Sequence, residues 1–367
     1  MGSAWIGALF LLTSSALNAA VLTVPLDAPS VQAAIELAAP GDEILVSPGI
    51  YPGGLDFLGK AVVVRSSGGA LVTTIDAQGA GPVVRFDNGE TESSVLDGFT
   101  LTGGTGENLA PGLTTGGGIF VVDASPDIRR CRVRANTADN GGGVAISGTS
   151  SVSFFQCAFE FNVAMFAGGG VSVEESASPE FLECEFTSNS ALTGGGAWAH
   201  LSQPTFRESL FVGNTAGLVG GAICMVSATT QVLGTRFDQN GAQNGGALLV
   251  DEAVLTCRRS TFFQNGAQAF GAAIRAQGAS DLLVQNCTLA HNSAIQGGGG
   301  IDVSDPAVTV TIHNSVIFWN GPDQLEPDVP ANAEVDYTAI QGGYPTGEGN
   351  HGLDPLFGSD DVPDDGS

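Results

Sequence analysis

Glu174, Trp198 and His200 are the residues of this sequence whose types could together do chemistry. Glu174 and His200 are 26 positions apart, and Trp198 precedes His200 by two. A carboxylate and an imidazole can exchange protons with a substrate, and an aromatic ring offers a sugar a flat apolar face. The same three residues could equally be a solvated Glu–His pair beside a tryptophan under a loop. The choice depends on whether the fold brings positions 26 apart together.

A short basic run is the second group that could bind a ligand. Arg132 and Arg134 lie next to Arg129 and Arg130, in a chain with 12 Lys and Arg against 38 Asp and Glu. We expect Arg132 and Arg134 to face outward, where they could contact an acidic ligand. The formal net charge of −26 argues against nucleic acids and anionic membranes, because both require a basic surface. We therefore expect no nucleic-acid partner.

A repeat of 25 to 28 residues must position these side chains. A small residue, an apolar residue two positions later and an asparagine three positions after that recur together eight times. Asparagine tolerates left-handed backbone at turns, and stacked amides can hydrogen-bond from one repeat to the next. We therefore assign the eight asparagines a structural role and no ligand role. They are Asn136, Asn162, Asn189, Asn214, Asn240, Asn265, Asn292 and Asn320.

Glycine-rich runs follow the first seven asparagines after five or six residues, and a short apolar strand follows each run. The strands alternate with a period of two, and neither regular leucines nor a helical period is present. A chain that coils through about three strands per turn would stack its coils about 4.8 Å apart. The repeat therefore predicts an all-β fold, a parallel β-helix or solenoid of roughly 25–28-residue coils.

Stacked coils place equivalent residues in columns that face inward or outward. Glu174 and His200 fall in one outward column on neighbouring coils, with Trp198 beside them. They are our candidate catalytic residues, and Trp198 is a candidate ligand-binding residue. Arg275 and Asp302 fall in a second outward column, where we expect a surface ion pair. The expected inward residues are apolar, as in the column Ile119, Val144, Val171, Ala197, Ile223, Leu248, Ile274 and Ile301, and in the column Phe159, Phe186, Phe211, Phe237 and Phe262.

Four of the six cysteines fall in one inward column that requires a small residue. They are Cys131, Cys157, Cys184 and Cys287. Vertical neighbours in parallel strands have poor disulfide geometry, so we predict buried free thiols. Cys224 falls in an outward column and is the one cysteine expected to be reactive. No Cys/His spacing typical of a metal site is present, and we predict neither a metal nor a cofactor.

The two ends depart from the repeat. An apolar stretch and a following Ala19-Ala20 predict a signal peptide. Ser30 is the expected N-cap of a short helix that covers the first coil. After Asn320 the pattern decays. The expected divisions are a signal peptide over 1–20, an N-terminal cap and first strands over 21–60, the β-helix over 61–325, an irregular closing segment over 326–357 and an acidic tail or linker over 358–367.

At several places the sequence resembles a known family. Ser30-Val31-Gln32-Ala33-Ala34-Ile35, Pro48-Gly49-Ile50-Tyr51 and Asp97-Gly98-Phe99-Thr100 resemble the start of bacterial secreted right-handed β-helix proteins of the pectin-lyase-like superfamily. Gly220-Gly221-Ala222-Ile223 and Phe186-Thr187-Ser188-Asn189 resemble the repeats of chlamydial polymorphic outer-membrane proteins. Asp354-Pro355-Leu356-Phe357 is similar to a closing motif of such proteins. The resemblance implies a right-handed parallel β-helix over about residues 24–357, and it implies no particular activity.

Three functions remain open at this point. The first is an exported, non-catalytic extracellular or cell-surface scaffold or adhesin. The second is a polysaccharide lyase, hydrolase or epimerase, and the third is a passive glycan-binding module. We prefer the first, with a polysaccharide or cell-surface glycan as partner, no membrane span in the mature chain, a monomeric state and a secreted or cell-surface location.

Overall fold

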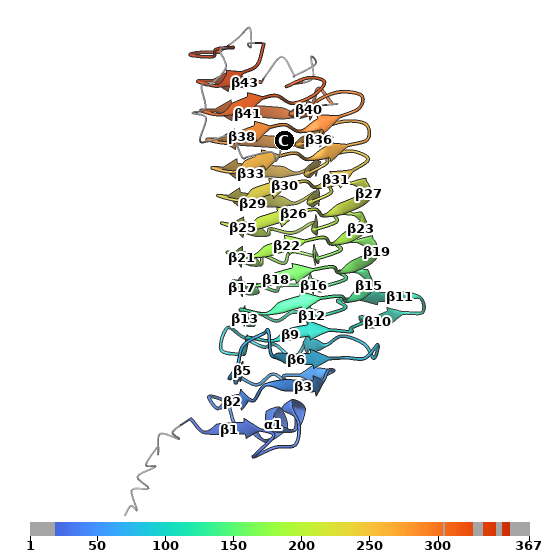
Figure 1. The fold of residues 1–367 in the computed structure, drawn as a ribbon, viewed down its shortest axis with the longest axis vertical. Helices are drawn as coiled ribbons and strands as arrows, with labels where there is room; N and C mark the ends of the chain where they lie inside the picture. The colour runs from blue at the N-terminus through green and yellow to red at the C-terminus, as the bar shows by residue number, and fades with distance from the viewer. Residues whose placement is uncertain (1–18, 304, 326–332, 343–346, 353–367) are drawn as a thin grey trace, which may run out of the picture.

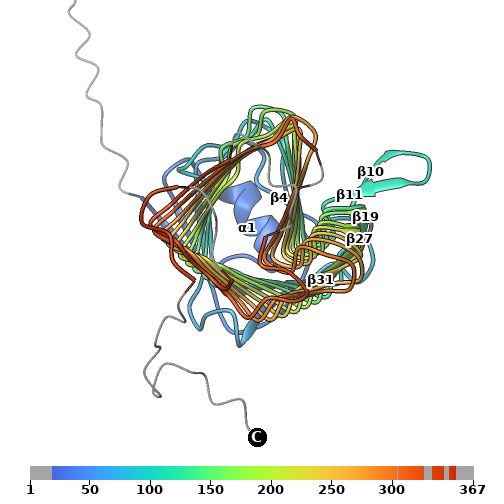
Figure 2. The ribbon, with the colours of Figure 1, turned by 90° about the horizontal axis from the view of Figure 1, so that it is seen from above.

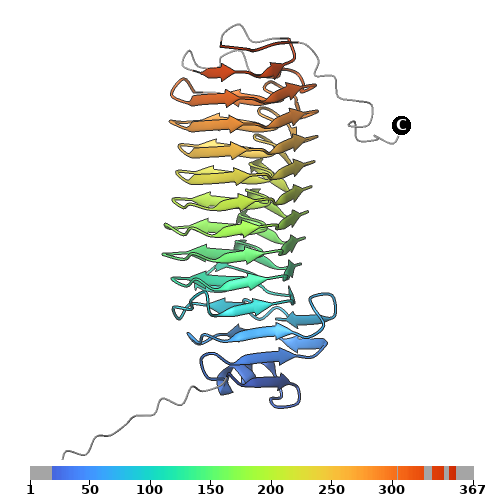
Figure 3. The same cartoon turned by 90° about the vertical axis from the view of Figure 1, so that its left-hand side faces the viewer.

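Successive coils of the chain lie one above another along a straight axis, as Figures 1 and 3 show from two sides. The structure, a computed structural model, describes residues 19–303, 305–325, 333–342 and 347–352. The coils after residue 116 each contribute one short strand to sheets A, B, D and C in turn up to residue 303, whereas the N-terminal coils have no strand in sheet D. Viewed along the axis, sheets A, B and C enclose the core, and the strands of sheet D project at one corner (Figure 2).

Sheet A is the longest sheet of the described chain. It has 13 strands, and every pair is parallel. In sheet order they are β1 (Val21–Val24), β2 (Glu43–Val46), β5 (Val63–Ser66), β8 (Val95–Asp97), β13 (Asp127–Arg129), β17 (Ser153–Phe155), β21 (Glu180–Leu182), β25 (Thr205–Arg207), β29 (Thr229–Leu233), β33 (Val254–Arg258), β37 (Asp281–Gln285), β41 (Thr309–His313) and β43 (Glu334–Asp336).

Sheet B follows sheet A within each coil. It has 12 described strands. They are β3 (Gly49–Pro52), β6 (Thr73–Asp76), β9 (Thr100–Thr102), β14 (Arg132–Arg134), β18 (Ala158–Glu160), β22 (Glu185–Thr187), β26 (Leu210–Val212), β30 (Arg236–Asp238), β34 (Thr261–Phe263), β38 (Thr288–Ala290), β42 (Val316–Phe318) and β44 (Ala339–Ile340).

Sheet D comes next along the chain and begins with the only antiparallel pair of the described strands, β10 and β11. Its nine strands are β10 (Glu107–Ala110), β11 (Leu113–Thr115), β15 (Thr137–Asn140), β19 (Val163–Ala167), β23 (Ser190–Thr193), β27 (Thr215–Val219), β31 (Gly241–Ala242), β35 (Gly266–Ala267) and β39 (Ser293–Ala294).

Sheet C closes each coil and carries the candidate site. Its ten described strands are β4 (Leu55–Asp56), β7 (Val84–Phe86), β12 (Ile119–Val122), β16 (Val144–Ser147), β20 (Val171–Glu174), β24 (Ala197–His200), β28 (Ile223–Val226), β32 (Leu248–Asp251), β36 (Ile274–Gln277) and β40 (Ile301–Val303). The parallel pairing of β20 with β24 sets Glu174 opposite His200. The predicted all-β parallel β-helix is therefore confirmed.

The core is built from the predicted inward columns. Phe186 is fully buried and stacks on Phe159 below it and Phe211 above it, with ring centroids 4.7 and 4.3 Å apart. Phenylalanines of sheet A pack edge-on against this column, as Phe181 does against Phe186 at 5.5 Å. Such contacts use both favourable aromatic geometries, so the core is ordered from coil to coil.

A buried ladder of asparagines joins the coils between sheets B and D. The Asn189 side-chain amide donates to the Phe159 carbonyl at 2.8 Å and to the Asn214 Oδ1 at 3.0 Å. Its own Oδ1 accepts the backbone and side-chain N–H groups of Asn162, both at 3.0 Å. Amide contacts of this kind run without a gap from Asn136 to Asn320.

The left-handed backbone at this corner is not on the asparagine itself, contrary to our expectation. It falls on the residue before it, as at Phe161 (φ 54°) and Ser188 (φ 54°). The asparagine amide must point inward to reach the next coil, so the preceding exposed residue makes the turn. Such a conformation costs about 1 kcal/mol or more for a non-glycine residue, which the buried hydrogen bonds offset.

The glycine corner between sheets D and C has a different cause. Gly141 has φ of +59°, and a Cβ on Gly142 would lie 2.4 Å from the Val163 carbonyl oxygen of the next coil. The backbones of adjacent coils therefore approach too closely for any side chain.

Helix α1 (Val31–Leu37) covers the N-terminal end of the core. Ser30 is its N-cap and accepts the Ala33 N–H at 3.2 Å, as predicted, and Val31, Ala34 and Ile35 are buried. None of the described helices is long and apolar enough to cross a membrane.

The C-terminal end is more regular than we expected. Strands β43 and β44 extend sheets A and B within the segment 326–357, part of which lies outside the described residues. The predicted tail, 358–367, and most of the predicted signal peptide also lie outside them.

Candidate functional site

The outer face of sheet C has one covered column and one open column. The covered column contains Phe120, Ser172 and Cys224, which are all buried although they point away from the core. The reason is the glycine corner, which folds over this column: a Cβ on Gly220 would lie 2.7 Å from the Cys224 Cβ. The open column, two residues further along each strand, includes Glu174 and His200, both half-buried.

Trp198 lies in the covered column, between Ser172 and Cys224, but it is only half-buried and reaches the open column beside Glu174 and His200. Glu174 and His200 are directly paired across strands β20 and β24. The Trp198 and His200 rings stack with centroids 5.3 Å apart and 18° between their planes. Ser172 donates to a Glu174 oxygen at 2.7 Å, which orients the carboxylate. The site thus offers an aromatic pair and an oriented acceptor.

A hollow of about 250 Å³ lies beside Glu174. Phe120 and Ser147 of sheet C line it, and Leu109 and Thr115 of the hairpin β10–β11 line it from the side. We did not predict this wall from the sequence. The hairpin lies outside the repeat, and the turn dipeptide Pro111-Gly112 was the only available signal.

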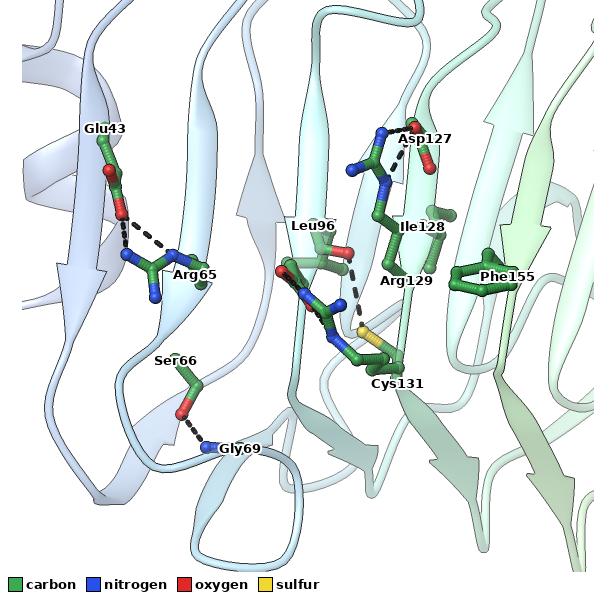
Figure 4. Close-up of polar contacts among 12 residues, drawn as sticks. Glu43, Arg65, Ser66, Gly69, Leu96, Asp127, Ile128, Arg129, Cys131 and Phe155 are labelled. Atoms are coloured by element: carbon green, nitrogen blue, oxygen red, sulfur yellow. Dashed lines mark hydrogen bonds and ion pairs between the residues drawn. The ribbon is translucent and has the colours of Figure 1, made fainter.

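The predicted basic cluster lies on the outer face at strands β13 and β14, and acids already contact its arginines. Arg132 donates to Glu160 at 2.8 Å, and the Arg134 Nε lies 3.7 Å from the same carboxylate. Arg129 pairs with Asp127, as Figure 4 shows, and this hydrogen bond raises the pKa of Arg129. An acidic ligand would have to compete with these partners.

A match to a family model identifies the family of this chain. A family model described as "Right handed beta helix region" matches residues 61–232 and also residues 117–274. Together the matches span 61–274, which is more than half of the 367 residues. This chain belongs to the right-handed β-helix family.

The β-helix is also similar to a solved structure described as "Structure of the receptor-binding protein of bacteriophage Det7: a podoviral tailspike in a myovirus". The sequences are 11% identical, the match covers 94% of this chain and 77% of that chain, and the TM-score is 0.34. No curated protein matches the sequence.

Two expectations about the outer face of the β-helix are wrong. Cys224 is 1% exposed, and burial raises the pKa of its thiol to about 12, so it is not a reactive surface cysteine. Arg275 and Asp302 do form the expected ion pair, with the Arg275 Nε 3.6 Å from an Asp302 oxygen, but the pair is not at the surface, because Asp302 is 3% exposed and the Arg275 side chain is largely buried. Both errors have one cause, the glycine corner that covers this column.

The other cysteines of the β-helix behave as predicted. All six are buried free thiols. Cys131 lies 3.7 Å from the Leu96 carbonyl oxygen (Figure 4), and burial raises the pKa of its thiol to about 12. Five of the thiols therefore fill space in the core, whereas Cys224 is buried outside it, under the glycine corner.

Proposed function

We propose that this β-helix is an exported, non-catalytic scaffold or adhesin of the cell surface or extracellular space, and that it binds a glycan on the open side of sheet C. The observation that carries the proposal is the stacked Trp198–His200 pair beside Glu174 and the hollow. We further propose that the chain acts as a monomer.

The chemistry of the site suits a sugar. An aromatic face can stack on the apolar C–H face of a sugar ring, and a carboxylate can accept its hydroxyl hydrogens. Glu174 borders both the Trp198–His200 pair and the hollow, so a carboxylate acceptor and an aromatic face are available within one site. Because the chain carries a net charge of −26, a neutral or amino sugar is favoured over an acidic one.

A binding assay tests the proposal. We expect Trp198→Ala to weaken binding to neutral or amino glycans on an array by about tenfold or more, because it removes the stacking surface. Trp319→Ala is the matched control: this tryptophan is 37% exposed and lies next to strand β42, away from the site. Equal binding by both variants, or no glycan bound by the natural chain, would contradict the proposal.

One observation supports a second candidate, a polysaccharide lyase, hydrolase or epimerase. Glu174 and His200 are paired on adjacent strands, so a possible acid and a possible base lie within one site. A depolymerisation assay with and without calcium separates the two functions. Product formed by the natural chain and lost in Glu174→Gln and His200→Ala would replace the scaffold proposal by the enzyme.

A further inference from the structure

Three metal-ligating side chains meet at the C-terminal end of sheet A. His313 of β41 is paired with Asp336 of β43, and Glu334 lies two residues before Asp336 on the same face of that strand. One imidazole nitrogen and one oxygen from each carboxylate lie within 4.8 Å of one another. The three residues come from two successive coils.

The distances between these groups are too long for hydrogen bonds. The His313 Nε2 is 4.0 Å from a Glu334 oxygen, and the Nδ1 is 3.9 Å from an Asp336 oxygen. A hydrogen bond would require about 3 Å. Two ligands that each bind one metal ion at about 2.0–2.2 Å stand about 3–4 Å apart. The two contacts use different ring nitrogens, only one of which can bind an ion, and one such nitrogen lies within 4.8 Å of an oxygen of each carboxylate. The spacing therefore suits groups that share an ion better than groups that bind each other.

A neighbouring contact holds one of the ligands in place, and another ligand is adjustable. The Asp336 Oδ1 accepts the Glu348 backbone N–H at 2.7 Å, so its other oxygen is the one that faces His313. His313 and Asp336 are half-buried, whereas the Glu334 side chain is 63% exposed and is free to rotate towards an ion. A backbone contact that orients a ligating carboxylate is common around bound metals.

We propose that His313, Glu334 and Asp336 bind a divalent transition-metal ion of the Zn²⁺ or Mn²⁺ class. One nitrogen and two carboxylate oxygens match that class, whereas Ca²⁺ and Mg²⁺ prefer oxygen ligands alone. The ion links the last described strand of sheet A to the strand before it. It therefore fastens the C-terminal coil of the β-helix.

Short ligand motifs in the sequence do not reveal this site. The ligands are 21 and 23 residues apart, and only the pairing of β41 with β43 brings them together. This site is separate from the sheet C site, so a result that overturns the metal proposal would leave the glycan proposal unaffected.

Calorimetric titration of the full chain with ZnCl₂, and separately with MnCl₂ and CaCl₂, tests the proposal. We expect one Zn²⁺ or Mn²⁺ ion per chain. Binding should weaken by about tenfold or more in His313→Ala and in Glu334→Gln, each of which removes a ligand. His291→Ala is the matched control, since this histidine packs against Trp319 outside the cluster, and it should bind as the natural chain does.

A second measurement remains informative if a variant folds poorly. Hydrogen exchange of residues 334–340 in the natural chain should slow when Zn²⁺ is added, and the exchange of β20 and β24 should not change. Zn²⁺ binding that survives in both ligand variants, no binding of Zn²⁺ or Mn²⁺, or an equal response to CaCl₂ that does not depend on His313 would each overturn the proposal.

Discussion

Along the ladder, the side chain of a corner asparagine hydrogen-bonds to the asparagine of the coil before it, to the asparagine of the coil after it and to a backbone carbonyl. Asn189 makes four such contacts and is completely buried. A buried amide whose hydrogen bonds are all made stabilises a fold modestly. Removing it costs more free energy, because its buried partners are left without hydrogen bonds. The ladder therefore makes each coil depend on its two neighbours.

Substitution of one ladder residue should be severe. Asn189→Ala leaves polar groups of Asn162, Asn214 and Phe159 without their buried partner. We expect the free energy of unfolding to fall by about 2–4 kcal/mol, measured by denaturant unfolding. Ser153→Ala, at an exposed position of β17, is the control and should change stability by less than about 0.5 kcal/mol. Equal effects would mean that the ladder does not stabilise the fold.

The cysteines give a second prediction at this scale. Burial raises the pKa of Cys131 and Cys224 to about 12, so their thiolates are scarce at pH 8. We expect a thiol reagent to label none of the six cysteines rapidly in the folded chain and all six after unfolding in guanidinium. Fast labelling of Cys224 before unfolding would show that the glycine corner opens in solution.

At the scale of elements, the phenylalanine columns hold sheets A and B together. Phe186→Ala removes a ring that stacks on two others in a fully buried position. We expect a loss of about 3–5 kcal/mol in the free energy of unfolding. Phe161→Ala is a matched control, because this ring is 52% exposed. A comparable loss in the control would contradict a stability centred on the stacked columns.

The N-terminal strands should respond to acid. Asp42 accepts the backbone N–H groups of Ala20 and Ala39, which lower its pKa below 3.8. A lowered pKa in the folded state stabilises the fold above pH 3.8 and loses this effect as the pH falls through the folded value. The melting temperature of the natural chain should therefore exceed that of Asp42→Asn at pH 5, and the difference should shrink towards pH 2.5. A difference that does not change with pH would contradict this role.

The sequence predicts the columns but not what covers them. The pairing of Glu174 with His200 follows from coil length and two-residue alternation, which are both visible in the chain. The burial of Cys224 could not be predicted, because the corner that covers it is a three-dimensional feature. The hollow near Leu109 and the cluster at Asp336 lie where the repeat is interrupted or shortened, so no column could be extended to them.

At the scale of the whole molecule, the β-helix is a one-dimensional stack with unequal ends. Helix α1 covers the core at the N-terminus, while β43 and β44, the last described strands of sheets A and B, have three and two residues. In such a stack each coil is stabilised mainly by its neighbours, so opening should begin at the weaker end.

Hydrogen exchange can follow this order directly. We expect amides of residues 334–340 to exchange first and those of the central coils, 119–294, to exchange last, because central coils have partners on both sides. Exchange at one rate along the chain would show that the β-helix opens as a single cooperative unit instead.

The hairpin β10–β11 shows that chain length around a coil is not tied to the rise between coils. Leu101 pairs with Val133 across 32 residues, whereas Val133 pairs with Phe159 across 26, and both pairs occupy the same inward column of sheet B. The additional residues project from the side of the β-helix as the hairpin, and the register of the core strands is unchanged. This corner is therefore a natural grafting point: loops of other lengths and chemistries could be exchanged here to alter what the surface recognises while the scaffold stays the same.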